Sequence, residues 1–281
     1  MVITMKNIKL VALDLDDTTL KSDSTLAEET YNALKKTAEA GIELVVASGR
    51  AYTSLPKRIL DIEGVNYAIS SNGSAIERAK TGERIYSRTI PEGVVREILN
   101  TFPHAMFECF IEGQPYCLRD YMEDPVKYGC SAAYVSYVRT TRRPVEDMVA
   151  FMEENIDRLD SIDIICPTPE IKAETYAAGK KLSGAYVTSS SPRLVEFASA
   201  EAGKGKALRW LCERLEVAPE NVAAFGNGDN DADMLTFAGL GVSVRNGTQY
   251  CRESADYICE TNDDLGVAKT LNKIIKKEPV R

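Results

Sequence analysis

The chain has 281 residues, of which 44% are hydrophobic and 27% are charged, so it can form one large domain or two medium domains with full cores. Its formal net charge of −8 argues against binding to nucleic acid or to a membrane surface, because both are bound mainly through clustered Lys and Arg. A small-molecule partner is therefore expected.

The first part of the chain predicts a β-α-β unit. Residues 8–13 form an almost continuous apolar run, which is typical of a strand covered on both faces of a parallel sheet. A helix is predicted from Thr25 to Gly41, with Thr25 and Glu28 as a capping box and Gly41 at its C-terminal end. Residues 42–48 predict a second buried strand, joined to the first by a right-handed crossover.

The alternation continues with a helix near 51–63 and a strand at 67–70. Residues 74–86 predict a hairpin that turns at residues 80–82, where the sequence is Lys-Thr-Gly. Further strands, mixed with helices, are predicted at 105–111, 132–138 and 161–167. These later strands alternate more between polar and apolar residues, which indicates a sheet with one open face.

The last third of the chain returns to the buried pattern. Strands are predicted at 189–199, 221–226 and 239–244, and helices at 204–216 and 264–276. We therefore predict an α/β fold with a parallel sheet built from both ends of the chain.

The domain organisation follows from this change of pattern. Residues 1–84 and 188–281 are expected to form the parallel core, and residues 85–187 an inserted α+β domain.

Cysteine usage and the N-terminus indicate a reducing compartment. The seven cysteines are odd in number and form no CxxC pair, which fits neither a disulfide framework nor a thiolate zinc site. The N-terminal residues lack the apolar core of a signal peptide, and no stretch reaches the roughly 18 apolar residues of a membrane span. We expect a cytoplasmic protein that is a monomer or a homodimer and binds no membrane.

Polar residues gather where the predicted parallel strands end, which is the edge at which open parallel sheets bind ligands. In chain order they are Asp14 and Asp16, Ser48-Gly49-Arg50, Asn72-Gly73, and residues 226–231 with the sequence GNGDND. Lys204, at the start of a predicted helix, can supply the positive charge that the clustered carboxylates require. Each motif alone is common in turns and helix caps, but their coincidence on one edge favours a functional site.

Other chemistries fit the sequence poorly. His104 is the only histidine and no GxSxG motif is present, which argues against a Ser-His-Asp hydrolase. The GKGK segment at 203–206 lacks the spacing of a phosphate-binding P-loop. The segment that begins at Asp229 lacks the glycine and the closing glutamate of a calcium-binding EF-hand loop.

Together the motifs resemble a known family. DLDDT at 14–18, Ser-Gly-Arg at 48–50, Lys-Gly at 204–205 and GNGDND at 226–231 resemble, in order and spacing, the four motifs of the haloacid dehalogenase superfamily. Asn72-Gly73 and the insertion resemble its Cof-type phosphatases. The resemblance covers nearly the whole chain and implies a three-layer α/β/α, Rossmann-like core with an inserted α+β cap that sets substrate choice.

The resemblance also implies residue roles. Asp14 would be the nucleophile that forms an aspartyl-phosphate, Asp16 the general acid and base, and Lys204 a catalytic cation that holds the phosphoryl group together with Ser48. The remaining phosphate- or substrate-binding residues would be Gly49, Arg50, Asn72 and Asn230. Mg²⁺ would be held by Asp14, Asp16 through its backbone carbonyl, Asn227 and Asp231, with waters.

Two residues depart from the family pattern. Asn227 stands where the family usually has an aspartate that binds the metal, so Mg²⁺ affinity should fall unless Asp231 or Asp229 compensates, and we expect Asp231 to do so. Asp17 replaces a frequent glycine after Asp16. Neither change removes the nucleophile.

The expected function is a Mg²⁺-dependent phosphatase acting on a small phosphorylated metabolite, with a sugar phosphate as the expected substrate. Within the insertion, Glu112, Tyr116, Arg119 and Tyr121 are candidate substrate contacts or ordinary surface residues. A phosphomutase, or a weakly catalytic protein of the same fold that binds a phosphorylated ligand, remains an alternative. A receiver-like signalling module is disfavoured, because such modules need an Asp after the third strand.

Overall fold

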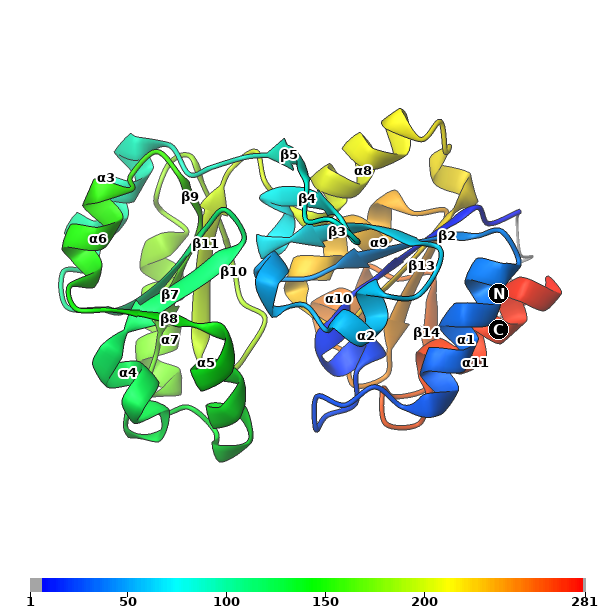
Figure 1. Cartoon of the computed structure of the whole chain (residues 1–281), viewed down its shortest axis with the longest axis horizontal. Coiled ribbons are helices and arrows are strands. Elements are labelled where there is room, and N and C mark those ends of the chain that lie inside the picture. Colours follow the sequence, from blue (N-terminus) through cyan, green and yellow to red (C-terminus); the bar gives the residue numbers. More distant parts are fainter. Residues whose placement is uncertain (1–6, 280–281) are drawn as a thin grey trace.

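The computed structural model of the chain describes residues 7–279, and its strands form two sheets. The core sheet has the order β14-β13-β12-β1-β2-β3-β4-β5, and the cap sheet has the order β10-β11-β9-β6-β7-β8. Figure 1 shows the two sheets side by side along the long axis of the molecule. The predicted α/β class is confirmed. The predicted start of the core at residues 1–6 lies outside the described residues.

The core sheet is parallel from β14 to β3 and antiparallel at β4 and β5. Its strands are β1 (Leu10–Leu13), β2 (Glu43–Ala47), β3 (Val65–Ser70), β4 (Ala75–Arg78), β5 (Arg84–Ser87), β12 (Val222–Gly226), β13 (Leu240–Val244) and β14 (Tyr257–Cys259).

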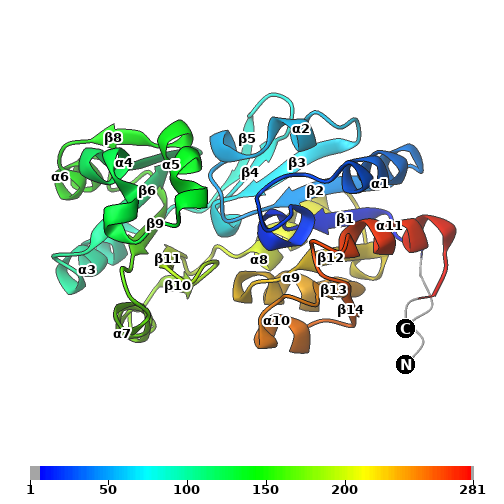
Figure 2. The same cartoon turned by 90° about the horizontal axis from the view of Figure 1, so that it is seen from below.

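Helices cover both faces of the core sheet, which explains why its central strands are apolar throughout. The helices of this part are α1 (Glu28–Glu39), α2 (Lys57–Leu60), α8 (Lys204–Arg214), α9 (Ala232–Phe237), α10 (Gln249–Glu253) and α11 (Gly266–Lys276). α1 and α11, from opposite ends of the chain, lie side by side over one face (Figures 1 and 2). α8 and α9 pack over the other face. Short helical turns are η1 (Leu15–Thr19), η2 (Tyr52–Ser54), η3 (Ser71–Gly73), η6 (Pro219–Asn221) and η7 (Asp229–Asp231).

The cap sheet has one face covered by helices and the other covered only in part. Its strands are β6 (Met106–Ile111), β7 (Gln114–Leu118), β8 (Arg143–Val145), β9 (Leu159–Ile165), β10 (Ala185–Thr188) and β11 (Leu194–Ser199). Its helices are α3 (Glu92–Thr101), α4 (Arg119–Glu123), α5 (Val135–Thr141), α6 (Met148–Glu154) and α7 (Pro169–Gly179), with turns η4 (Pro125–Tyr128) and η5 (Ala132–Tyr134). Phe107, Ile162 and Phe197 pack beneath α3, α6 and α7. Alternate residues on the opposite face are more polar.

Three element predictions are wrong. Residues 189–199 do not return to the parallel sheet, because β11 pairs antiparallel with β9 and β10 in the cap sheet. Residues 132–138 form η5 and the start of α5 rather than a strand. The helix expected over 51–63 is reduced to η2 and the short α2, because Pro56 cannot continue a helix that begins before it.

The capping box predicted for α1 is absent. Ala27 is the N-cap residue of this helix and makes no side-chain capping bond. The Thr25 hydroxyl instead donates a 2.5 Å hydrogen bond to the carboxylate of Asp23. Gly41 does end the helix as predicted, with φ +80°. Short β14, at the edge of the core sheet, was not predicted.

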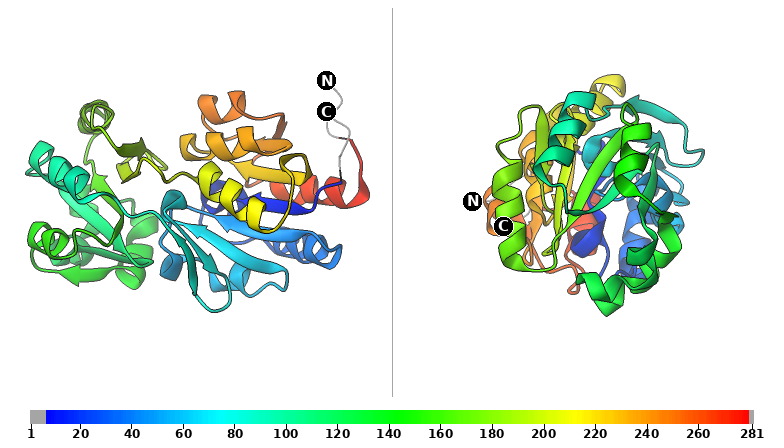
Figure 3. Two further views of the ribbon diagram at one scale, coloured as in Figure 1. Left: turned by 90° about the horizontal axis from the view of Figure 1, so that it is seen from above. Right: turned by 90° about the vertical axis from the view of Figure 1, so that its left-hand side faces the viewer.

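Two connections, residues 88–91 and 200–203, link the sheets (Figure 3). Near the first connection, Arg84 forms a bidentate ion pair with the buried Asp160 of β9, at 2.7 and 2.8 Å. Asp160 also accepts a 3.0 Å hydrogen bond from the backbone N–H of Gly113. These contacts join the hairpin β4-β5 to the cap sheet and fix how the two sheets meet.

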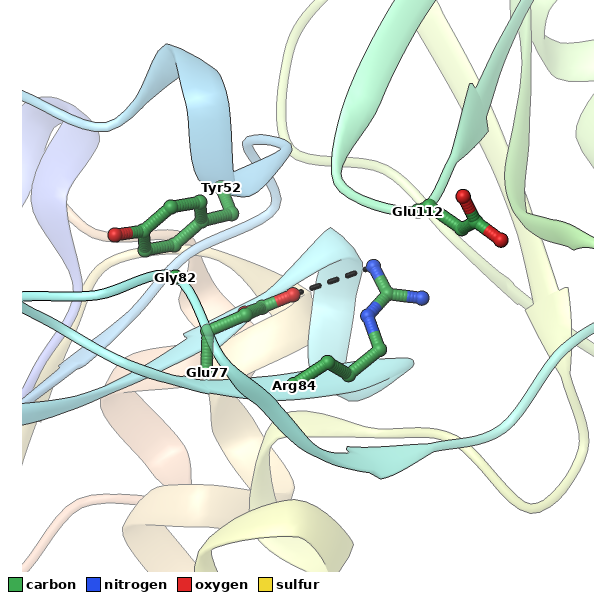
Figure 4. Close-up of a pocket in the computed structure, with 5 residues that line it drawn as sticks. All are labelled: Tyr52, Glu77, Gly82, Arg84 and Glu112. Atoms are coloured by element: carbon green, nitrogen blue, oxygen red, sulfur yellow. Dashed lines mark ion pairs between the residues drawn. The ribbon is translucent and has the colours of Figure 1, made fainter.

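A cavity of about 340 Å³ lies at this junction (Figure 4). Glu77, on β4, points into it and lies 3.2 Å from the guanidinium of Arg84. Burial raises the pKa of Glu77 to about 7, with a smaller contribution from the charge of Asp160, although Arg84 and Ser70 act in the opposite direction.

The raised pKa of Glu77 predicts a pH-dependent stability. Between its ordinary pKa and about 7 the folded state binds more protons than the unfolded state, so the free energy of unfolding falls as pH rises through this window. Glu77→Gln should be more stable than the wild type at pH 8 by about 1–3 kcal/mol and close to it at pH 4. Urea unfolding at both pH values measures this difference. A variant less stable at pH 8 would contradict the prediction.

Among residues 7–279, no helix combines the length and the apolar character needed to cross a bilayer. The seven cysteines, all in the described part, are free thiols, as predicted from their number and spacing.

Candidate active site

Three charged residues from distant segments meet at the carboxyl end of the core sheet. Asp14 directly follows β1, Lys204 is the first residue of α8, and Asp231 ends η7. The Lys204 ammonium Nζ lies 2.7 Å from Asp14 Oδ1 and 2.6 Å from Asp231 Oδ1. Lys204 and Asp231 are fully buried and Asp14 is 5% exposed. Lys204 therefore supplies the positive charge that the acidic strand end was predicted to need.

The two Asp14 oxygens have different surroundings. Oδ1 is held by Lys204, whereas Oδ2 is buried and has no hydrogen-bond partner among residues 7–279. Burial raises the pKa of Asp14 to about 7, as does the nearby charge of Asp231, while Lys204 lowers it. Burial alone would lower the pKa of Lys204, but Asp14 and Asp231 raise it, so the lysine is held as a cation.

Asp16 is bound by a residue from the second predicted motif. The Arg50 guanidinium pairs with both carboxylate oxygens of Asp16, at 2.8 and 2.5 Å. The cap covers Arg50 from the other side, because its guanidinium carbon lies 4.5 Å from the ring centroid of Tyr137 in α5. The Arg50 guanidinium thus contacts Asp16 and Tyr137, and its role in phosphate binding stays a prediction.

The backbone of η1 explains the departure at Asp17. Asp17 has φ +55°, a left-handed conformation that glycine adopts without cost and other residues adopt rarely. The glycine that is frequent at this position in the family that the motifs resemble would adopt this conformation easily. The next residue, Thr18, donates a 3.1 Å hydrogen bond from its hydroxyl to the side-chain carbonyl of Asn227. It joins the first motif to the last, a role the sequence analysis did not assign.

The predicted phosphate-binding residues lie on the same edge. The backbone N–H of Asn72 donates to the carbonyl of Ser48 at 3.1 Å, and the Asn230 amide donates to Asn72 Oδ1 at 2.9 Å. Gly49 lies against Asn72, where an added Cβ would come within 3.1 Å of the amide oxygen. Gly73 has φ +86°, and a Cβ there would overlap the backbone of Gly203.

The predicted metal ligands are not equivalent. Asp231 uses Oδ1 for Lys204, and its Oδ2 accepts hydrogen bonds from the backbone N–H groups of Asn227 and Gly228, both at 2.9 Å. Its carboxylate is therefore fully engaged by the protein, which does not support the prediction that it compensates for Asn227. Within the described part of the chain, no three His, Cys, Asp or Glu side chains are arranged as a metal-binding group. The predicted set relies instead on one or two carboxylates, carbonyl oxygens and water.

A crevice of about 540 Å³ opens between the cap and the core beside Asn227. The cap contributes Lys172 and Tyr176 from α7 and the loop 189–192. The core contributes Asp17, residues 227–229 and Thr248. The volume is in the range of small-molecule sites in proteins.

The four cap residues predicted as substrate contacts do not line this crevice. Tyr116 packs on Phe151 beneath the helices, and Tyr121 is buried next to Tyr128. Glu112 and Arg119 form ion pairs with Arg158 and Glu146, respectively, at the surface.

Six residues of the cap that lie toward the core sheet were not predicted from the sequence. They are Glu108, Tyr137, Arg142, Asp163, Ser190 and Glu196. Acidic residues inside otherwise apolar strand segments, such as Glu108 in β6 and Glu196 in β11, are a sequence signal that could have identified them. Such residues are costly to bury without a partner.

Comparisons with known proteins agree with this geometry. Residues 11–271 match the model of the haloacid dehalogenase-like hydrolase family. Phosphatase YwpJ of Bacillus subtilis is 28% identical, with 95% of this chain and 100% of that protein covered. The B. subtilis 5-amino-6-(5-phospho-D-ribitylamino)uracil phosphatase YcsE is 26% identical, with 94% and 95% covered.

Comparison with a solved structure shows that the fold is also that of a haloacid dehalogenase-like hydrolase. A haloacid dehalogenase-like hydrolase from B. subtilis is 27% identical to this chain, covers 94% of it and 99% of its own chain, and superimposes with a TM-score of 0.82. The family match spans both sheets and every motif at the strand ends. The chain belongs to the haloacid dehalogenase-like hydrolase family.

Proposed function

We propose that the protein is a Mg²⁺-dependent phosphatase that hydrolyses a small phosphorylated metabolite through an aspartyl-phosphate. The observation that carries the proposal is the state of Asp14, whose one oxygen is held by a buried lysine while the other has no partner in the described chain. A carboxylate fixed in this way is suited to act as a nucleophile. The phosphatase names of the relatives support the same reaction.

The proposed reaction has two steps. In the first, the free oxygen of Asp14 attacks phosphorus, the ester P–O bond breaks, and Asp16 gives a proton to the leaving alkoxide. In the second, Asp16 takes a proton from water, the water oxygen attacks phosphorus, and the bond to Asp14 breaks to release phosphate. Lys204 and Ser48 hold phosphoryl oxygens and stabilise the charge that develops on them.

The pairing of Asp16 with Arg50 bears on the first step. Both oxygens of Asp16 accept hydrogen bonds from the guanidinium, so neither is free to contact a leaving group. We infer that Arg50 releases one oxygen of Asp16 when substrate enters. Arg50 also contacts Tyr137, so movement of the cap and release of Asp16 would be linked.

The residues present fit a magnesium ion. Asp14 and Asp231 share only one buried lysine, which leaves an excess negative charge, and one oxygen of Asp14 lacks a partner. The Asp14 carboxylate, the backbone carbonyl of Asp16 and the side-chain carbonyl of Asn227 would hold the ion, all hard oxygen ligands. When bound, Mg²⁺ supplies positive charge to the phosphoryl group. We assign Asp231 to holding Lys204 and the backbone at Asn227.

We expect weak Mg²⁺ binding, because Asn227 carries no charge where the family usually has an aspartate. Asn227→Asp adds a carboxylate to the proposed ligand set and should lower the Mg²⁺ concentration for half-maximal activity by about tenfold. Titration of activity with Mg²⁺ measures this change. Asn100→Asp, which adds the same charge on the exposed face of α3, is the control and should leave the titration unchanged. An unchanged midpoint in Asn227→Asp would remove residue 227 from the metal site.

Asn227 also favours a second candidate function, a protein of this fold that binds a phosphorylated ligand and turns it over slowly. A large gain in kcat for Asn227→Asp would support this alternative, whereas an unchanged kcat would argue against it.

The expected substrate is a sugar phosphate or a related polar phosphate ester. Support comes from the crevice beside Asn227, whose walls carry the hydroxyl groups of Ser189, Ser190 and Ser191 and the cation of Lys172. We propose that the inserted cap sets substrate choice and that the enzyme works in the cytoplasm. Phosphate release from a metabolite panel, with and without EDTA, tests the proposal. The absence of Mg²⁺-dependent release from every ester, while a control phosphatase works, would refute it.

A further inference from the structure

Three acidic residues form a row on the face of the cap sheet opposite α3, α6 and α7, a face that α4 and α5 cover in part. Glu108 stands opposite Asp163, and Asp163 stands opposite Glu196, across β6, β9 and β11. Residues opposite each other in an antiparallel sheet project from the same face with Cβ atoms about 5 Å apart. The intervening residues, such as Ile162 and Phe197, form the apolar core under the cap helices. The acidic row therefore faces the core sheet.

One end of the row is neutralised. Arg142 forms a bidentate ion pair with Glu108, at 2.9 and 3.1 Å, and is itself buried. Its guanidinium carbon lies 4.6 Å from the ring centroid of Tyr137, which also contacts Arg50. Since Arg50 binds Asp16, this end of the row is connected to the first motif of the active site.

The other end of the row lies by Asn72 and Lys204. Both residues are near enough to Glu196 to lower the pKa of its carboxyl group, although burial has the larger effect and raises it. Glu196 Oε1 accepts a hydrogen bond of 2.5 Å from the hydroxyl of Ser190. The row thus crosses the roof of the site from the side of Asp16 to the side of Lys204.

Two members of the row lack an ion-pair partner, although the hydroxyl of Ser161 donates a 3.1 Å hydrogen bond to Asp163 Oδ1. Asp163 and Glu196 are each 4% exposed, and neither forms an ion pair within the part of the chain that the structure describes. Glu196 Oε2 is buried and has no hydrogen-bond partner there. Burial raises the pKa of Asp163, as do Glu196 and Glu108. Because buried acids without an ion-pair partner destabilise a folded protein, folding alone does not account for them.

Two residues that line the crevice beside Asn227 are neighbours of Glu196. Ser190, whose hydroxyl binds Glu196, lines the crevice, and so does Lys172, whose pKa is raised by the charge of Glu196 although burial lowers it overall. An ester bound with its phosphoryl group at Asp14 that reaches this wall of the crevice would therefore come near Glu196, which stands opposite Asp163.

We propose that Glu196 and Asp163 bind hydrogen-bond donors of the leaving group, so that the enzyme selects phosphate esters whose alcohol carries hydroxyl or amino groups. This inference rests on the proposed phosphatase function and specifies its substrate class. Asp163 and Glu196 each accept a hydrogen bond from a serine at one oxygen, so the other oxygen of each can accept from such groups. An apolar leaving group would offer no donor to these oxygens. The site therefore favours donor-rich esters and rejects apolar ones.

The test compares esters of similar size. Glucose 6-phosphate and glucosamine 6-phosphate present hydroxyl and amino donors, whereas cyclohexylmethyl phosphate has a ring but no donor. We expect kcat/KM for the better sugar ester to exceed that for cyclohexylmethyl phosphate at least 100-fold. Glu196→Gln and Asp163→Asn should each reduce this ratio about 10- to 100-fold, because each exchanges an acceptor for a donor. A higher kcat/KM for glucosamine 6-phosphate than for glucose 6-phosphate would indicate that the carboxylates recognise the positive charge of the amino group. Equal kcat/KM values for these two sugar esters would indicate recognition through hydrogen bonds.

Stability separates this role from a structural one. Because each variant removes a buried carboxyl group that forms no ion pair, both should unfold at the same temperature as the wild type or higher at pH 8. Glu153→Gln, on the exposed face of α6, is the matched control and should change neither the ratio nor the unfolding temperature. A ratio unchanged in both variants, or an equal loss for all esters together with a lower unfolding temperature, would overturn the inference. If no ester is hydrolysed, including p-nitrophenyl phosphate, the phosphatase proposal itself fails.

Discussion

Asp14→Asn is expected to lower kcat for phosphate release by about 10⁴-fold or more, because it removes the proposed nucleophile. Asparagine has nearly the same shape, and Lys204 keeps its ion pair with Asp231, so the variant should remain folded. Phosphate release from p-nitrophenyl phosphate at saturating Mg²⁺ measures the effect, and circular dichroism checks the fold.

The control for this variant is Asp23→Asn, which changes an exposed acid a few residues further along the same loop. It should retain activity within about twofold, because Asp23 contacts only its neighbour Thr25 among the hydrogen bonds of the described chain. Substantial turnover by folded Asp14→Asn would mean that another group attacks phosphorus.

Lys204→Met should have the largest effect on stability. It leaves Asp14 and Asp231 buried and close together without a cation, and removing one partner of a buried ion pair costs about 3–5 kcal/mol. The free energy of unfolding in urea at pH 8 measures the loss. Activity should also disappear, because the ammonium group proposed to hold the phosphoryl group is lost.

A double variant tests the electrostatic origin of this loss. Lys204→Met combined with Asp14→Asn removes one of the two repelling carboxylates and should recover about 1–2 kcal/mol relative to Lys204→Met alone. Recovery should be smaller at low pH, where the carboxylates bind protons. If the double variant is as unstable as the single one at pH 8, lost packing of the lysine side chain rather than charge explains the effect.

Local sequence signals predicted most of the core. The apolar runs of β1, β2 and β12 indicate buried parallel strands, and parallel strands place the residues that follow them at one edge. We could therefore assign four residues to one site without knowing any contact between them: Asp14, Ser48, Asn72 and Asn230. Lys204 was placed there because it begins a helix and carries the required charge.

Contacts between distant segments were not predictable in this way. Arg50 was expected to bind phosphate, but its position also depends on Tyr137, which lies in a segment that resembled a strand and folds as α5. Asp231 was expected to bind metal, but its two oxygens are taken by Lys204 and by backbone N–H groups of its own loop. Both outcomes depend on three-dimensional neighbours rather than on residue type.

The acidic row shows the same limit for the cap. Glu108, Asp163 and Glu196 become neighbours only through the register of β6, β9 and β11. β11 had been assigned to the core sheet, because its apolar run gives no information about which sheet it joins.

The central claim is that Asp14 carries the phosphoryl group during turnover. Borohydride reduces an aspartyl-phosphate to homoserine, so quenching a single turnover with borohydride and sequencing the peptides by mass spectrometry reports the residue that was phosphorylated. We expect homoserine at position 14 only in the presence of substrate, and none in Asp14→Asn. Turnover of substrate with the reduced residue at another position, or with no reduced residue at all, would contradict it.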